Sequence, residues 1–287
     1  MNRDFLKYLL GLLLFGSNGV VASFIHLPSQ EIVLLRSLLG SIFLLLLFLL
    51  GGGRFSIRRY KRDAFFICLS GIAMAADWLL LFEAYARIGV SLGMIINYCG
   101  PILVILASAV IFHEKITGKT IAALLLALFG AVLISWQGME SGIDRTGLLL
   151  AVLSAFAIAA MVILNKMSGN VTGMENSVLQ LSATFVVVAV YAVFRKNSLV
   201  LPARLDILPV LWLGVINTGM GCYLYFSPLG RLKAQTVAIC GYLEPLSAVF
   251  FSMLILHERL LPLQAAGAVM ILAGTMIINL QKTMRFF

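Results

Sequence analysis

The chain has 287 residues, of which 61% are hydrophobic and 11% charged, and its formal net charge is +9. Soluble globular proteins carry about 25% charged residues, so water cannot be the solvent for most of this surface. The basic residues lie in short segments beside long apolar runs, and no DNA- or RNA-reading motif accompanies them. The composition therefore indicates a protein of the lipid bilayer, and it speaks against a nucleic-acid partner.

Ten apolar runs have the length of about 20 residues that a helix needs to cross a bilayer core. The runs are uniformly apolar rather than alternating, which argues against strands. A helix also satisfies its backbone polar groups internally, as hydrocarbon requires. We therefore predict an all-α membrane protein with ten transmembrane helices. In chain order, they are expected at residues 5–26, 30–50, 64–86, 90–112, 119–137, 146–167, 175–194, 206–229, 233–256 and 262–281.

Lysine and arginine positions predict the orientation of these helices. If the first residue is cytoplasmic, fourteen Lys and Arg residues fall on the cytoplasmic side, six fall on the other side, and Arg36 falls inside a run. Cytoplasmic loops of membrane proteins carry such an excess. We therefore expect both termini in the cytoplasm, and we interpret the basic cluster between Arg54 and Arg62 as orienting charges.

An internal repeat appears when the sequence is shifted by 144 residues. The shift aligns Tyr98 with Tyr242, Pro101 with Pro245, residues 113–115 (His-Glu-Lys) with 257–259 (His-Glu-Arg), and Gly130 with Gly274. Each copy then holds five runs, and an odd number of spans inserts the second copy upside down. Inverted repeats are typical of secondary transporters, whose substrate sites lie near the midplane at the repeat interface. We therefore predict two inverted five-helix repeats, at residues 1–138 and 145–282, and a transport function.

Charged residues inside a bilayer are costly, so each is a functional candidate. Glu244 lies near the middle of the ninth run, and Pro245 after it removes a backbone hydrogen bond. We interpret Glu244 as a group that binds substrate or carries a proton; the alternative is a protonated acid packed against a neighbouring helix. Asp77, beside Trp78 in the third run, is either a second acid for a cationic group or a structural hydrogen-bond partner.

Arg36 and Glu83 lie toward the same side of the second and third runs. The favoured interpretation is that they pair with each other. The alternative is that Arg36 holds a substrate carboxylate with its planar guanidinium. An acid and a base near the midplane would suit a zwitterion, which favours amino acids over cationic drug-like compounds bound by Glu244 and Asp77.

Uncharged polar and aromatic side chains inside the runs are expected to divide between lining a cavity and joining helices. They are Asn18, Asn97, Tyr98, Gln180, Asn217, Tyr223, Gln235 and Tyr242. Pro101 and Pro245 are either hinges for alternating access or locally tolerated kinks. Gly130 and Gly274, each with a small residue seven positions earlier (Ala123 and Gly267), predict close helix packing. Glu114 and Glu258 at the ends of runs are expected in caps and loop salt bridges.

Several of these features form a known pattern: Gly16-Ser17-Asn18, Arg36, Leu243-Glu244-Pro245, and the blocks 101–114 and 245–258, each from a proline to a glutamate. In them the chain resembles the ten-helix EamA-type branch of the drug/metabolite transporter superfamily, over essentially its whole length. It departs from that pattern at Phe15, where many members resemble a Trp-Gly pair. The resemblance implies a bacterial inner-membrane carrier, often an exporter of amino acids or similar metabolites, with peripheral fifth and tenth spans.

Cofactor and metal sites are not expected. The four cysteines lack CxxC spacing, the His-Glu pairs lack further ligands, and no nucleotide-binding motif occurs. We expect no enzyme but a secondary transporter that moves a small polar metabolite by alternating access. Protons are a candidate coupling ion, and a monomer and a homodimer are both open. A channel and a non-transporting receptor are the alternatives of a different class.

Overall fold

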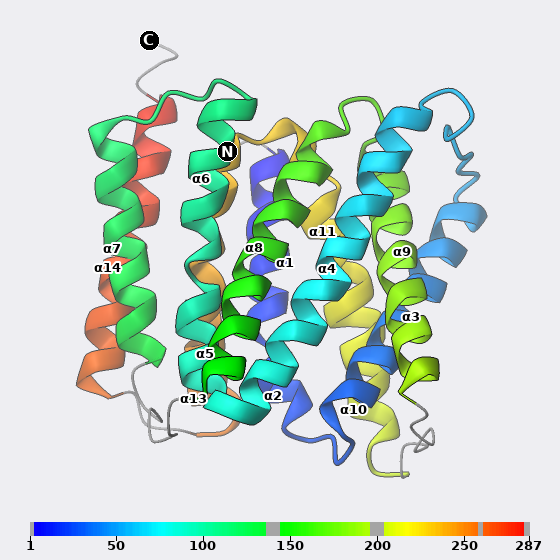
Figure 1. Ribbon diagram of the computed structural model, residues 1–287, viewed down its shortest axis with the longest axis horizontal. Coiled ribbons are helices and arrows are strands. Elements are labelled where there is room, and N and C mark those ends of the chain that lie inside the picture. Colours follow the sequence, from blue (N-terminus) through cyan, green and yellow to red (C-terminus); the bar gives the residue numbers. More distant parts are fainter. Residues whose placement is uncertain (1–2, 136–143, 196–203, 258–260, 284–287) are drawn as a thin grey trace.

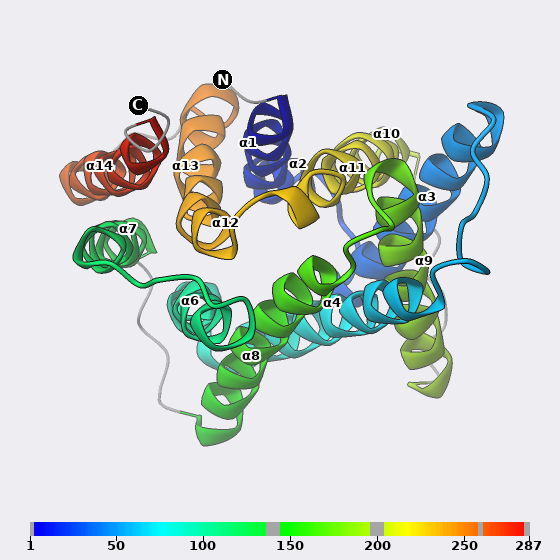
Figure 2. The same cartoon turned by 90° about the horizontal axis from the view of Figure 1, so that it is seen from above.

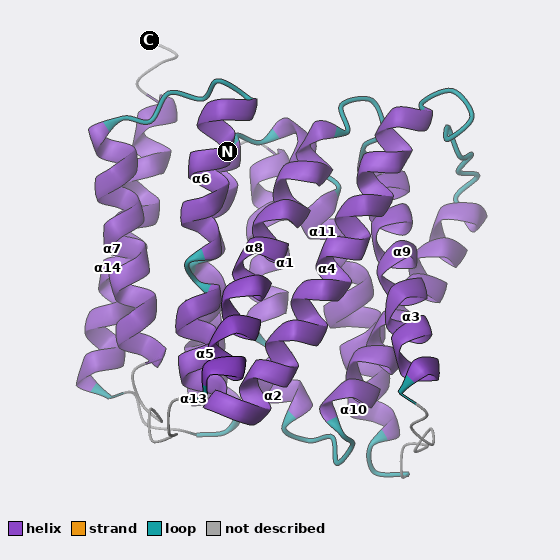
Figure 3. Cartoon of the chain, in the orientation of Figure 1, coloured by secondary structure: helices purple, strands orange, loops and turns teal. Residues whose placement is uncertain are grey.

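The computed structural model describes residues 3–135, 144–195, 204–257 and 261–283, and within these ranges every regular element is a helix (Figures 1 and 3). Eight helical segments are long and apolar enough to cross a membrane, and two shorter apolar helices, Gly118–Ile134 and Pro262–Ile277, bring the described total to ten. The predicted fold class, ten transmembrane helices in two repeats, is confirmed.

The helices of the two halves follow the predicted order. The first half contains α1 (Arg3–Gly16), α2 (Asn18–Ala22), α3 (Ser29–Leu50), α4 (Lys61–Ile88), α5 (Val90–Asn97), α6 (Gly100–Ile111) and α7 (Gly118–Ser135). The second half contains α8 (Arg145–Met167), α9 (Gly173–Phe194), α10 (Ile207–Leu211), a π-helix (Trp212–Met220), α11 (Gly221–Phe226), a 3₁₀ turn (Leu229–Arg231), α12 (Ala234–Gly241), α13 (Leu243–Ile255) and α14 (Pro262–Thr283).

Four of the predicted spans are not continuous α-helices. The fourth span is divided into α5 and α6, and Figure 3 shows a short loop between them. The ninth span is divided into α12 and α13. Pro101 and Pro245 explain both breaks, because proline cannot donate to the carbonyl four residues earlier. The first span breaks at Ser17, whose hydroxyl donates to the Leu14 carbonyl (2.7 Å), and the eighth contains the π-helix. These last two interruptions were not predicted.

The start of α1 and the end of α14 lie on one face of the bundle, which we call the terminal face (Figure 1). Helices α7 and α14 lie side by side at one end, far from α3 and α9 at the other (Figures 1 and 2). A Cβ atom added to Gly130 would lie 2.5 Å from the Gly267 carbonyl oxygen, and one added to Gly274 would lie 2.6 Å from that of Ala123. The predicted close packing of these small residues is confirmed.

The repeat is also visible in the backbone. Among the described residues other than glycine, positive φ angles occur at His113 (53°) and His257 (54°), which the shift of 144 residues aligns. Each histidine follows the second part of a broken span, α6 or α13. A left-handed conformation is uncommon for residues with a Cβ atom. Its presence at both positions shows that the two halves end these helices in the same way.

Candidate functional site

A cavity of about 250 Å³ lies between the halves, beside the two proline-associated breaks. Its volume approaches the 300–1,000 Å³ that is usual for small-molecule sites. Its lining runs from Tyr8, in the first half of α1 toward the terminal face, to Leu81 and Tyr85, in the second half of α4 toward the opposite face. Most residues predicted for the site line this cavity, namely Asn18, Arg36, Asp77, Trp78, Asn97, Tyr98, Pro101, Tyr242 and Glu244.

Arg36 is buried, and two neighbours fix its side chain. Its Nε donates to the Thr218 hydroxyl (3.0 Å), and its guanidinium lies 4.5 Å from the centre of the Trp78 ring. The π-helix carries Thr218, whose own hydroxyl donates to the Leu213 carbonyl (2.8 Å). Arg36 forms no close ion pair with a described carboxylate, although the charge of Glu244 acts on its guanidinium.

The favoured pairing of Arg36 with Glu83 is therefore wrong. The Glu83 carboxylate instead contacts Arg87 (3.1 Å), one helical turn later, and Arg195 (3.4 Å) at the end of α9. The sequence predicted similar depths in the membrane for Arg36 and Glu83. In the structure, however, Arg36 lines the cavity and Glu83 does not.

Asp77 joins helices and lines the cavity at the same time. Its carboxylate accepts a hydrogen bond from the Asn97 side-chain amide (2.9 Å), and the same amide group donates to the Ser154 hydroxyl (3.1 Å). These contacts link α4, the end of α5 and α8, so they orient the carboxylate at the break in the fourth span. The structural hydrogen bond foreseen as an alternative is present.

Glu244 occupies the first turn of α13, directly after the break in the ninth span, and lines the cavity. Its carboxylate makes no hydrogen bond or close ion pair with a described residue, but the Arg36 charge acts on it, and a helix N-terminus is a favourable place for a negative charge. Gly16 lets α1 approach this turn, because a Cβ atom there would lie 1.7 Å from the Ser247 hydroxyl oxygen. The glycine of the Gly16-Ser17-Asn18 motif therefore shapes one wall of the site.

Tyr98 and Tyr242, which the repeat aligns, meet between the two breaks. The Tyr242 hydroxyl donates to the Tyr98 backbone carbonyl (2.7 Å), and the ring centres are 6.1 Å apart. In a continuous helix, the Ile102 amide would donate to the Tyr98 carbonyl. At the break beside Pro101 it donates to the Cys99 carbonyl instead, so the Tyr98 carbonyl does not receive this helical hydrogen bond. The first half thus offers a backbone acceptor to a side chain of the second half.

Three residues predicted for the site lie behind the cavity wall. The Asn217 amide donates to the Ser17 hydroxyl (2.7 Å) and the Asn18 side-chain oxygen (3.1 Å), and so joins the π-helix to the break in the first span. Gln180 accepts from Asn165 (3.1 Å) in a buried amide network between α8 and α9. Pro245 is buried and is not among the lining residues.

Sequence reasoning missed three tyrosines that line the cavity, Tyr8, Tyr85 and Tyr225. The ring centres of Tyr8 and Tyr225 are 5.0 Å apart, and the Tyr8 hydroxyl donates to the Val237 carbonyl (2.8 Å) in α12. A hydroxyl-bearing ring inside an apolar run was the signal that could have found them, as it found Tyr98. Phe15, where the sequence departs from the family pattern, stacks on Tyr225 at 5.6 Å and also lines the cavity.

Polar contacts join the halves on the terminal side of the cavity. The Glu114 carboxylate accepts from the backbone amides of Ala234 (2.9 Å) and Gln235 (3.2 Å) at the start of α12, and it pairs with Lys166 (3.6 Å) at the end of α8. We call Glu114, Lys166, Ala234 and Gln235 the terminal seal. The predicted cap and salt bridge of Glu114 are confirmed, whereas Glu258 lies outside the described residues.

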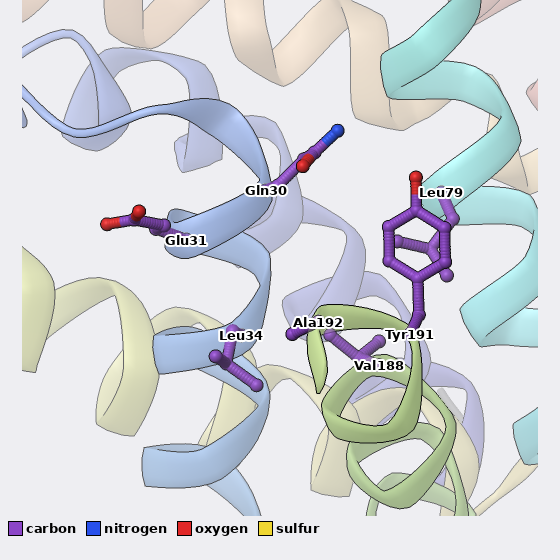
Figure 4. A pocket seen from close by; sticks show the side chains of 7 residues that line it. All are labelled: Gln30, Glu31, Leu34, Leu79, Val188, Tyr191 and Ala192. Atoms are coloured by element: carbon purple, nitrogen blue, oxygen red, sulfur yellow. The ribbon is translucent and has the colours of Figure 1, made fainter. Parts of the chain in front are cut away.

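A second pocket lies between α3, α4 and α9 (Figure 4). Its volume is about 20 Å³, which is room for little more than a water molecule. Its lining combines Gln30, Glu31 and Tyr191 with Leu34, Leu79, Val188 and Ala192. The larger cavity is therefore the candidate site.

Comparisons with known proteins agree with this geometry. The model of the EamA-like transporter family matches residues 5–136 and again 145–280. An uncharacterized transporter of Bacillus subtilis (strain 168), YxxF, is 25% identical over 272 residues, which cover 94% of this chain and 87% of the relative. A probable amino-acid metabolite efflux pump of Escherichia coli (strain K12) is 26% identical over 230 residues, 76% of this chain and 72% of the relative. One protein crystal structure shares the fold, with a TM-score of 0.83 over 98% of this chain and 99% of its own, at 17% identity.

Proposed function

The chain belongs to the EamA-like transporter family, and from this premise we propose that it is a secondary transporter of amino acids or related polar metabolites. The observation that carries the proposal is the cavity beside the two broken spans. Discontinuous helices in equivalent places of two repeats are the usual setting of a transporter substrate site. The cavity presents one guanidinium, on Arg36, and two carboxyl groups, on Asp77 and Glu244.

This set of charges suits a zwitterion. The guanidinium of Arg36, already oriented by Thr218 and Trp78, can accept a carboxylate in a two-pronged contact. Glu244 forms no hydrogen bond or close ion pair with a described residue, although the Arg36 charge acts on it, and it is the acid that we assign to a substrate amine or to a transported proton. The Asp77 carboxylate already accepts a hydrogen bond from Asn97, so we assign it a smaller part than Glu244 in binding the substrate amine or the proton.

We assign the mechanism to alternating access between the halves 1–138 and 145–282, with Pro101 and Pro245 as hinges. The terminal seal joins the two halves on the terminal side, and the cavity lining reaches from Val237, beside the seal, to Tyr85 in the later turns of α4. Rocking of the halves would open the seal and close the opposite side. This proposal makes the structure one of two access states.

Export is the proposed direction, across the bacterial inner membrane and with both termini in the cytoplasm. The relatives support it by name, because one is called a probable amino-acid metabolite efflux pump. The excess of Lys and Arg on one side supports the orientation. Protons are the proposed coupling ion, since Glu244 lies in the cavity as a titratable group.

Counterflow in proteoliposomes tests the proposal. The vesicles are preloaded in turn with amino acids, amines and nucleosides, and uptake of the labelled compound is followed. Saturable, trans-stimulated uptake of one class supports a carrier and identifies its substrate. Glu244→Gln should lower this uptake at least tenfold, the loss that corresponds to about 1.4 kcal/mol, whereas the matched control Glu83→Gln should not. Wild-type uptake by Glu244→Gln would contradict a contact of Glu244 with the substrate amine, whereas a role in proton transport requires net uptake driven by a pH gradient to be measured.

A cationic drug-like substrate is the second candidate, because the cavity holds two carboxyl groups for one guanidinium. Counterflow by amines alone, insensitive to Arg36→Lys, would favour it. Flux without saturation or counterflow would indicate a channel, and binding without flux would indicate a receptor. Counterflow therefore separates the two carriers and the channel, and a binding measurement on the same protein identifies the receptor.

A further inference from the structure

Five basic residues lie within nine positions of the loop between α3 and α4 and the first turn of α4. They are Arg54, Arg58, Arg59, Lys61 and Arg62, and all five are exposed. This loop lies on the terminal side, at the end of the bundle far from α7 and α14 (Figures 1 and 2). We call these five residues the basic platform. The preference for Lys and Arg in cytoplasmic loops explains why these residues are basic. It does not explain why the loop has a defined fold.

The loop is held in one conformation. Gly52 adopts a φ of +73° after the end of α3, and the chain turns back so that the Phe55 ring lies 4.7 Å from the Phe48 ring. The Ser56 amide and hydroxyl both donate to the Glu175 carboxylate, at 2.6 Å and 2.9–3.0 Å. These contacts fasten the loop to α9, so the basic residues are presented by a fixed backbone.

The nearby acids face inward and do not neutralise the platform. Glu175 accepts from Ser56, and the buried Asp63 accepts from the backbone and side-chain amides of Asn170, both at 2.8 Å. None of the ion pairs between described residues includes a member of the platform. Five positive charges are therefore left without a carboxylate partner among the described residues.

The remaining contacts leave the N–H edges of two of these arginines exposed, close in sequence to outward-facing apolar side chains. The guanidinium groups of Arg59 and Arg62 lie 5.4 Å and 5.6 Å from the ring centres of Tyr60 and Phe66, which leaves their N–H edges for another acceptor. Next to them are apolar side chains that face outward, with Leu50 84% exposed and Phe65 62% exposed. Apolar groups beside unpaired cations match the boundary between acyl chains and phosphate headgroups.

We propose that the basic platform is a binding site for the phosphate groups of anionic phospholipids. The lipid phosphate contacts the arginine N–H edges, and its acyl chains lie along the exposed apolar residues of α3 and α4. The site is separate from the transport cavity, since none of its five residues lines that cavity. It depends on the membrane setting alone and not on the identity of the transported compound.

The test uses full-length protein in a neutral detergent. Phosphatidylglycerol and phosphatidylcholine with the same acyl chains are titrated separately, and the amount of retained lipid is measured by native mass spectrometry. We expect tighter binding of phosphatidylglycerol, and weaker binding when the salt concentration is raised. Each removed charge should weaken it about fivefold, so Arg54→Gln/Arg58→Gln/Arg59→Gln should weaken it on the order of 100-fold. Inorganic phosphate at the same concentration should not compete, because it lacks the acyl chains.

The matched control is Lys115→Gln/Lys119→Gln, which removes two exposed charges from the same face. It should bind phosphatidylglycerol as the wild type does. If the triple variant does not fold, Arg58→Gln and Arg59→Gln are measured singly, each with an expected fivefold loss. Equal binding of the two lipids by the wild type, or an equal loss in the Lys115→Gln/Lys119→Gln control, overturns the proposal. Competition by inorganic phosphate also overturns it and indicates a site for a free anion.

Discussion

The hydrogen bond from the Tyr242 hydroxyl to the Tyr98 carbonyl joins the two halves and offers a direct test of alternating access. Tyr242→Phe removes the hydroxyl and keeps the ring, whose centre lies 6.1 Å from that of Tyr98. In the proposed alternating access, rocking would move one half against the other. We therefore expect this bond to stabilise the state with a closed terminal seal, and to be lost in the state open on the terminal face.

The size of the effect follows from the single bond that is lost. An intramolecular hydrogen bond contributes a net of about 0.5–1.5 kcal/mol. Since 1.4 kcal/mol is a factor of ten in an equilibrium constant, Tyr242→Phe should shift the equilibrium toward the state open on the terminal face by roughly 2- to 13-fold.

Labelling of a buried cysteine by maleimide measures this shift. The reporter is Ala234→Cys in a protein whose four native cysteines have been replaced, because Ala234 is 0% exposed and belongs to the terminal seal. Its labelling rate should rise roughly 2- to 13-fold in Tyr242→Phe. Tyr98→Phe is the matched control, since it retains both the accepting carbonyl and the donating hydroxyl. An unchanged rate in Tyr242→Phe, or an equal rise in Tyr98→Phe, would refute the reasoning.

Three further substitutions test the packing, each by thermal unfolding in detergent. Gly130→Ala places a methyl group against a carbonyl of α14 and should lower stability by about 1–3 kcal/mol; Gly118→Ala, with nothing within 4 Å, is its control and should be neutral. His113→Gly relieves a left-handed conformation and should add up to about 1 kcal/mol, and a loss instead would argue against strain at this position. Asn176→Ala removes one side of a reciprocal pair of 2.9 Å hydrogen bonds with Asn165 and should cost about 1–3 kcal/mol, so an unchanged melting temperature would contradict it.

Features that depend on the chain's own periodicity could be predicted from the sequence. The apolar runs contain the ten helices, and the alignment of residues 144 positions apart identified Tyr98 and Tyr242, which meet in space. Pro101 and Pro245 marked two helix breaks because the missing N–H is a local property of proline. The roles assigned to the cavity residues stay predictions, as do the repeat boundaries.

Features that depend on rotation and contact between helices could not be predicted. Arg36 and Glu83 lie at similar depths, but depth does not say which way each helix is turned, and so their pairing was wrong. No proline marks the break at Ser17 or the π-helix. Both interruptions are joined by the Asn217 amide, a contact between residues 200 positions apart that no local pattern reveals.

The contact between α7 and α14 restricts how the molecule can change shape. Gly130 and Gly274 bring the two helices together so closely that a single methyl group would not fit at either point. Sliding of one helix along the other would drive side chains into these two contacts, so the pair should move as one solid piece. If the halves rock as proposed, we expect α7 and α14 to stay fixed against each other while the remaining helices of each half move, about an axis near this edge of the protein (Figure 2) rather than through its centre.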